Sequence, residues 1–321
     1  MTTDTARPPA SRRIALPRVV QNYGVYAAVL ALLAYNAVFT PHFLDGANLR
    51  TQLVQAAPIV IVALGMALVI GSEGIDLSVG SVMALAAAII PLYLGFGVWP
   101  AVIMALVAGM AAGLFNGTLV AVVGLQPIVA TLALLVAGRG LALVFAGGQL
   151  KQLHNPDLLA LGDGDLAGVP VIVLAAAALT LVTAVLVGRT TYGRRLVAVG
   201  GNRSAAALAG LPVRRILITA YVLCGLFAAV AGVFATARLT ASDPSAIGNL
   251  AELSAITAVV VGGTPLTGGR IRVLGTVAGA LVMQLVRATL IKHDLPDSAA
   301  QMTQAAIILL AVYIARERRT R

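Results

Sequence analysis

The chain has 321 residues, of which 60% are hydrophobic and only 11% are charged. Soluble domains carry about a quarter charged residues, so this composition excludes an ordinary soluble enzyme and predicts a protein that lies in membrane lipid. The net charge of +10 is spread too thinly, with too few aromatic residues, to form a nucleic-acid groove. We therefore expect no nucleic acid among the partners.

Ten apolar stretches follow a polar, basic N-terminal segment over residues 1–20. Their approximate bounds are residues 22–40, 53–70, 81–97, 101–123, 128–146, 171–188, 216–238, 253–267, 273–291 and 299–315. They are rich in Gly and Ala, which let helix backbones approach closely in lipid. We predict an all-α fold, a polytopic transmembrane helical bundle of about ten spans forming one domain over residues 21–315, with a basic tail over residues 316–321.

The arginines predict which ends of these spans face the cytoplasm. They gather before the first stretch, after the last one, and in the loop over residues 189–215, which contains no acid. Loops rich in arginine stay in the cytoplasm, so both termini and this loop are expected there. The span count agrees, because six stretches precede the loop and four follow it.

Two polar, glycine-rich segments interrupt the apolar pattern, one over residues 71–81 and one over residues 262–270. Paired interruptions in corresponding places of two halves indicate broken helices and a solute path between internal repeats.

The first interruption contains Glu73 and Asp76, and a charge inside the bilayer is costly unless it faces a cavity or a partner. One interpretation places both carboxylates on the solute path, whereas the other has Asp76 cap the helix that begins near Leu77. Arg139 lies deep in an apolar stretch, where it contacts solute, pairs with an acid such as Glu252, or extends to the membrane interface. Our candidates for the solute pathway are Asp76, Ser78, Asn116, Gln126, Thr131 and Arg139, although the amides among them also suit simple helix–helix hydrogen bonds.

Several kinds of chemistry have no motif in this sequence. It contains no GxxxxGK[ST] phosphate loop, no HExxH and no CxxC. We expect no metal, no cofactor and no enzymatic activity, so the energy for any active transport must come from a partner protein or an ion gradient.

The loop over residues 189–215 predicts one short helix over residues 203–209. Asn202 suits the N-cap position, Gly210 suits the left-handed position after the helix, and Pro212 prevents continuation. The alternative is an ordinary basic loop held near lipid headgroups.

Motifs in chain order resemble those of one family, the permeases of bacterial ABC importers for ribose and related sugars. The matching runs are Gly74-Ile75-Asp76-Leu77-Ser78-Val79-Gly80-Ser81, Asn116-Gly117, Pro127-Ile128-Val129-Ala130-Thr131-Leu132, Ala137-Gly138-Arg139-Gly140, Gly200-Gly201-Asn202 and Gly268-Gly269-Arg270. Residues 125–148 look similar to the galactofuranose-type branch. One departure is Glu73, an acid where relatives have glycine.

The resemblance implies a permease domain over residues 21–315 in the bacterial plasma (inner) membrane that imports a monosaccharide, such as a pentose or hexose. The implied partners are a cytoplasmic ABC ATPase subunit, an extracytoplasmic sugar-binding protein, and a second permease copy or paralogue. It also implies coupling to the ATPase through Arg194, Arg195, Gly200, Gly201, Asn202, Ala205, Leu208, Ala209 and Gly210. The alternatives are a secondary transporter that uses Glu73, Asp76 and Arg139, or an ABC permease for nucleosides or branched-chain amino acids.

Overall fold

Every apolar stretch expected from the sequence overlaps a helix in the structure, a computed structural model that describes residues 18–316. The all-α prediction is confirmed. The long helices are α1 Arg18–Phe39, α2 Gly46–Gly71, α3 Val79–Tyr93, α4 Val98–Thr118, α5 Pro127–Ala146, α7 Val171–Arg189, α10 Val213–Leu239, α11 Ala251–Val261, α12 Val273–Lys292 and α13 Asp297–Arg316. The 3₁₀ turn η1 Leu94–Phe96 extends α3, and the π-helical turn η2 Leu119–Val123 extends α4.

Seven helices of the described part are long and apolar enough to cross a membrane. They are α2, α3 with η1, α4 with η2, α5, α7, α10 and α12. The apolar part of α1, Tyr23–Phe39, and the whole of α11 are shorter. The chain is therefore a multi-pass helical membrane protein.

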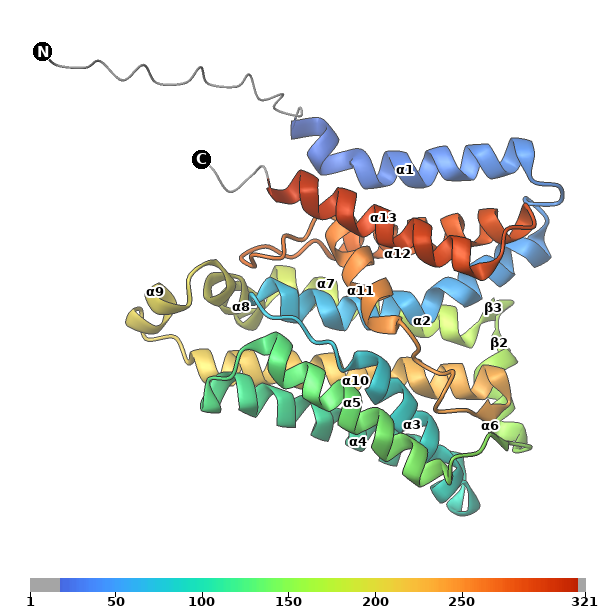
Figure 1. Cartoon of the computed structure of the whole chain (residues 1–321), viewed down its shortest axis with the longest axis horizontal. Helices are drawn as coiled ribbons and strands as arrows, with labels where there is room; N and C mark the ends of the chain where they lie inside the picture. Colours follow the sequence, from blue (N-terminus) through green and yellow to red (C-terminus); the bar gives the residue numbers. More distant parts are fainter. Residues whose placement is uncertain (1–17, 317–321) are drawn as a thin grey trace, which may run out of the picture.

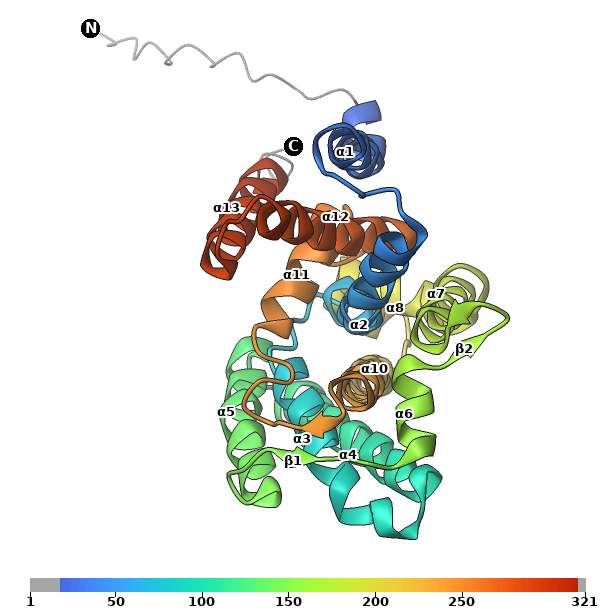
Figure 2. The same cartoon turned by 90° about the vertical axis from the view of Figure 1, so that its right-hand side faces the viewer.

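Helices α2 and α10 form the centre of the bundle (Figure 2). Every side chain of α2 from Val60 to Gly71 is buried. The helices approach closely through glycine, since a Cβ at Gly113 of α4 would overlap the backbone of Tyr221 in α10. This small-residue packing is the kind that holds helices together in lipid, where no hydrophobic effect drives them together.

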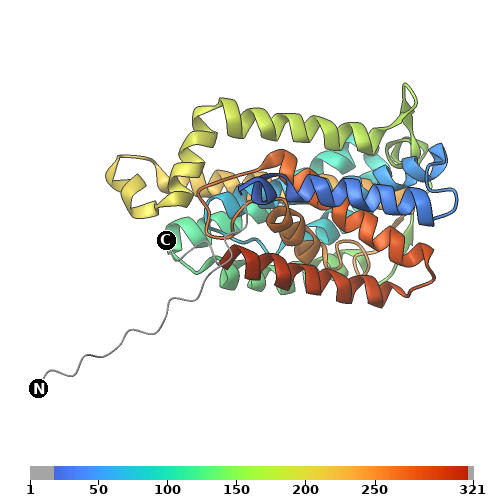
Figure 3. The same cartoon turned by 90° about the horizontal axis from the view of Figure 1, so that it is seen from above.

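The bundle has two chemically different ends (Figures 1 and 3). The start of α1, the end of α13 and the short helices α8 Thr191–Gly201 and α9 Arg203–Leu208 lie at one end, which we call the α9 end. The other, the α6 end, carries α6 Pro156–Asp163 and two small antiparallel sheets, β1 Lys151–Gln152 with β4 Ala241–Ser242, and β2 Asp165–Leu166 with β3 Val169–Pro170. Basic side chains at the α9 end are Arg189, Arg194, Arg195, Arg203, Arg214, Arg215, Arg270 and Arg272, while most acids lie at the α6 end.

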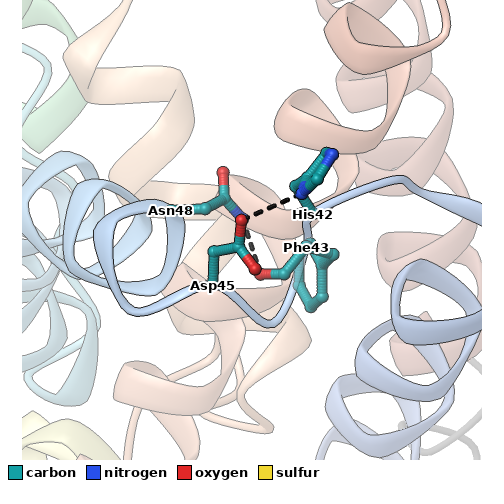
Figure 4. Close-up of polar contacts among 4 residues, drawn as sticks. All are labelled: His42, Phe43, Asp45 and Asn48. Atoms are coloured by element: carbon teal, nitrogen blue, oxygen red, sulfur yellow. Dashed lines mark hydrogen bonds and ion pairs between the residues drawn. The ribbon is translucent and has the colours of Figure 1, made fainter.

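A tight turn at the α6 end joins α1 to α2 (Figure 4). The ring nitrogen Nδ1 of His42 lies 3.1 Å from Oδ2 of Asp45, and Asn48 donates from its amide to the carbonyl of Phe43 at 2.8 Å. His42 has a φ of +58°. These contacts hold a left-handed backbone that fixes where α2 enters the bundle.

Candidate functional site

The first interruption expected from the sequence is a re-entrant segment, residues 72–78, that runs from the α9 end into the interior (Figure 1). Helix α3 starts where this segment ends. Its Ser81 hydroxyl donates to the carbonyl of Leu134, which lies seven residues into α5. At 1.5 Å per residue, α3 therefore begins about 10 Å below the α9 end.

Asp76 organises this re-entrant turn. Its Oδ1 accepts from the backbone N–H of Ser78 at 2.9 Å, the Ser78 hydroxyl at 2.6 Å and the Asn116 amide at 3.3 Å. Asn116 also donates to the Ser78 hydroxyl at 2.8 Å. All three side chains are at most 1% exposed. The carboxylate closes the turn that precedes α3, because it accepts from the N–H two residues further on. The N-cap position of α3 is Ser78, so Asp76 is not the helix cap that one interpretation of the sequence expected.

The second interruption lies elsewhere than the sequence predicts. Residues 262–272 form a connector between α11 and α12 at the α9 end. The segment that enters the interior is residues 243–250, which lie between the expected apolar stretches 216–238 and 253–267. It comes from the α6 end to start α11 (Figures 1 and 2). The prediction fails because the place of residues 243–250 depends on contacts with Arg139 of α5 and Gly80 of α3, which are distant in the sequence.

Arg139 anchors this second re-entrant segment. Its Nη1 donates to the carbonyls of Pro244 at 2.6 Å and Ile247 at 2.7 Å, and its Nη2 donates to the carbonyl of Gly248 at 3.1 Å. Arg139 lies seven residues before the end of α5, about 10 Å below the α6 end. Arg139 therefore holds backbone in place, and its position mirrors that of the first segment.

The two re-entrant segments meet inside the bundle. A Cβ at Gly80, in the first turn of α3, would overlap the backbone oxygen of Gly248 and lie 2.5 Å from Oε2 of Glu252 in the first turn of α11. The N-termini of two short helices thus converge, each reached from the opposite end. The positive end of a helix dipole suits the carboxylate of Glu252. This arrangement is typical of inverted repeats in transporters.

The remaining pathway candidates fall into two groups. Thr131 is buried and donates to the carbonyl of Ile75 at 3.3 Å, so it ties α5 to the first re-entrant segment. Gln126 is exposed at the α9 end, directly before α5, and its side chain makes no capping bond. The structure therefore brings together Asp76, Ser78, Asn116 and Thr131, whereas Arg139 and Gln126 lie toward opposite ends of α5.

The loop over residues 189–215 contains two helices rather than one. Helix α9 forms as expected: Asn202 Oδ1 accepts from the N–H of Ala205 at 2.9 Å, and Gly210 has a φ of +78°. Helix α8 is amphipathic, with Arg194 and Arg195 exposed and Leu196 and Val199 buried. Sequence reasoning missed α8, although its apolar residues three apart were a signal.

Within residues 18–316, the outer side of α9 is left uncovered. Ala205 and Ala209 are exposed, and Leu208 is 91% exposed. The other side of this helix is tied down, because Arg203 donates to the carbonyls of Ser72 at 3.1 Å and Glu73 at 3.3 Å. The α9 surface (Ala205, Leu208 and Ala209) is thus linked directly to the start of the first re-entrant segment.

Comparison with known families matches residues 48–312 to the permease component of branched-chain amino acid transport systems. The chain belongs to this family of membrane permeases. The resemblance to ribose-type and galactofuranose-type permeases is confirmed by the individual relatives.

Three relatives match most of the chain. The galactofuranose transporter permease protein YtfT of Escherichia coli (strain K12) is 38% identical over 91% of this chain and 88% of its own. The fructose import permease protein FruF of Bifidobacterium longum (strain NCC 2705) is 37% identical over 82% of this chain and 75% of its own. The ribose import permease protein RbsC of Bacillus subtilis (strain 168) is 35% identical over 96% of both chains. No solved structure shows a significant match.

Proposed function

We propose that this chain is the permease subunit of an ATP-driven importer that moves a monosaccharide into the cytoplasm. The observation that carries the proposal is the α9 surface, an exposed docking face held by Arg203 against the first re-entrant segment. A separate ATPase subunit docks at this surface, and its movement reaches the interior through the Arg203 contacts. The permease itself supplies no phosphate loop for nucleotide.

The choice of a sugar over other solutes rests on the relatives. Their names specify galactofuranose, fructose and ribose. A family-wide description that mentions branched-chain amino acids is broader than these individual matches. We therefore place this chain with the sugar permeases, whose sugar-binding protein delivers solute at the α6 end.

The proposed topology has ten spans in one permease domain over residues 21–315, with both termini and the α9 end in the cytoplasm of a bacterial cell. The concentration of arginine at the α9 end supports it. Helices α1, α11 and α13 complete the count beyond the seven long apolar helices. A second permease copy or a paralogue packs beside this one in the lipid.

The rival proposal, a secondary transporter, needs Glu73, Asp76 and Arg139 to act as a relay. Glu73 is exposed at the α9 end, Asp76 is enclosed by neutral hydrogen-bond donors, and Arg139 binds loop carbonyls toward the α6 end. These three groups do not form a continuous chain of ionisable contacts, so the geometry favours the ATP-driven importer.

Reconstitution tests the proposed function. Proteoliposomes contain the permease with its cognate ATPase subunit, and the cognate binding protein is added outside with labelled ribose, arabinose, fructose or galactose. We expect uptake of at least one sugar with ATP inside and none with ADP. Uptake by the permease alone, driven by a proton or sodium gradient, would contradict the proposal.

A further inference from the structure

A polar pocket of about 300 Å³ lies beside the second re-entrant segment. It is lined by parts of α2, α11, α12 and α13 together with residues 246–250 of that segment. Its polar lining includes Asn249, Ser254, Gln284 and Gln304. None of these residues belongs to the Asp76 network or to the α9 surface.

The depth of these amides in the bundle needs an explanation. Gln284 lies eight residues before the end of α12, and Gln304 lies seven residues after the start of α13. Both are thus about 10 Å or more below the α6 end. Polar side chains at such depth face a partner or a water-filled cavity rather than lipid.

Hydrogen bonds already fix the orientation of two amides. Gln284 donates from Nε2 to Oε1 of Gln52 at 3.0 Å and to Oε1 of Gln55 at 2.7 Å, while Gln304 donates from Nε2 to the Ser254 hydroxyl at 3.0 Å. These bonds restrict the rotation of both side chains. A preorganised set of amides and hydroxyls loses little entropy when a solute binds.

We propose that this pocket holds the solute as it enters from the α6 end, and that Asn249, Gln284 and Gln304 contact the hydroxyl groups of a monosaccharide. The inference rests on the proposed function and names the solute site within it. Nε2 of Gln284 already donates twice within the protein, so this side chain would contact the solute through its Oε1 acceptor. The amide group in Asn249 and Gln304 carries both donors and an acceptor, which matches the mixed character of sugar hydroxyls.

The charge of the lining argues against a solute that carries a positive group. Arg287 is the one charged side chain among the lining residues of the described part. A zwitterionic amino acid would also need a carboxylate for its ammonium group, and those lining residues include no acid. An arginine, by contrast, donates readily to sugar hydroxyls.

The pocket also borders the part of the second re-entrant segment that Arg139 anchors. Its wall includes Asn249 and Leu250, which directly follow the carbonyl of Gly248 that Arg139 binds. Solute binding is therefore adjacent to the segment that starts α11. A solute bound in the pocket would therefore contact the second re-entrant segment next to the point where Arg139 anchors it.

The test combines kinetics with chemical access. In the reconstituted importer, with the same four labelled sugars, Gln304→Leu and Asn249→Ala should each raise the KM for uptake about tenfold, the loss expected for one hydrogen bond to solute. Maximal uptake and ATPase association should stay unchanged. Gln152→Leu removes an exposed amide at the same end of the bundle, outside this pocket, and should leave KM unchanged.

Chemical access provides a readout independent of kinetics. In a Cys224→Ala background, Gln304→Cys should react with a small impermeant thiol reagent added from the α6 side, and the transported sugar should slow the reaction. Normal KM values together with an unreactive cysteine would overturn the site while leaving the proposed function in place. Failure of the wild type to take up any of the four sugars would overturn both.

Discussion

Gly269 donates its backbone N–H to the carbonyl oxygen of Gly71 at 3.0 Å, which fastens the α11–α12 connector to the end of α2. Gly200, near the end of α8, fits between them, since a Cβ there would overlap the Gly71 oxygen and lie 2.8 Å from the nitrogen of Gly269. Three backbones thus meet without intervening side chains. We call this contact the glycine junction, and it sits where the first re-entrant segment begins.

The close contacts at the glycine junction predict that one added methyl group at Gly200 destabilises the protein. Gly200→Ala should destabilise the protein by about 1–3 kcal/mol through overpacking against fixed backbone. Gly201→Ala is a matched control, because the nearest atom to its Cβ is 4.0 Å away and both changes gain the same helix propensity. Thermal unfolding in detergent measures the difference. Equal melting temperatures for both variants would contradict the role of the junction.

Substitution of Asp76 should lower the stability of the protein, and a conservative substitution should lower it less. Asp76→Ala removes the acceptor for Ser78 and Asn116 and should cost about 1–3 kcal/mol, because buried donors then lack a partner. Asp76→Asn keeps one oxygen acceptor and should recover part of that stability. Melting temperatures of the two variants test the order. A stable alanine variant that transports nothing would instead place Asp76 on the solute path.

Topology is tested by cysteine labelling in a Cys224→Ala background. Ser204→Cys lies on α9 and Asp163→Cys lies at the end of α6, so the two sites mark opposite ends of the bundle. An impermeant reagent added outside intact cells should label position 163 and not position 204, because arginine-rich ends stay in the cytoplasm. Labelling of position 204 in sealed cells would reverse the orientation.

Local rules accounted for much of the fold. Apolar length predicted a helix in each of ten places, and the capping residues around Asn202 predicted α9, because these signals act within a few residues. The first re-entrant segment was also visible, since Gly, Ser, Glu and Asp stand together where a membrane span would otherwise continue.

Long-range contacts could not be predicted in the same way. Nothing near Arg139 in the sequence points to the carbonyls of Pro244, Ile247 and Gly248, which are more than 100 residues away. The second re-entrant segment was missed for the same reason, because its place depends on Arg139 and on the contact between Gly80 and Gly248. The amides of the polar pocket likewise come from separate helices and become a group only after folding.

A substitution on the exposed α9 surface should weaken association with the ATPase subunit without affecting the fold of the permease. Leu208 is 91% exposed, so Leu208→Glu should leave folding within ~0.5 kcal/mol of the wild type, as surface changes usually do. The new carboxylate should weaken ATPase association by being buried without a partner at the contact. Leu166→Glu, at a residue 67% exposed at the α6 end, is the matched control. Normal ATPase co-purification with Leu208→Glu would exclude this surface as the docking site.

Substitution of Arg139 should loosen the second re-entrant segment and leave the rest of the bundle in place. Its planar guanidinium donates to three carbonyls at once, whereas a lysine ammonium has no such planar fork. Arg139→Lys should therefore retain part of the anchoring, and Arg139→Leu should remove it, leaving the carbonyls of Pro244 and Ile247 without this donor. The expected cost of the leucine variant is ~3 kcal/mol or more.

Hydrogen exchange of the purified protein measures where that loss falls. Amides of residues 245–250 should exchange faster in Arg139→Leu, with an intermediate rate in Arg139→Lys, because the segment opens locally before the bundle unfolds. Amides of residues 72–78 should keep their protection, since Asp76 and Thr131 hold that segment separately. Arg238→Leu removes a charge at the same end and should change neither segment. Faster exchange spread over the whole bundle would show that Arg139 stabilises the fold generally rather than positioning the second re-entrant segment.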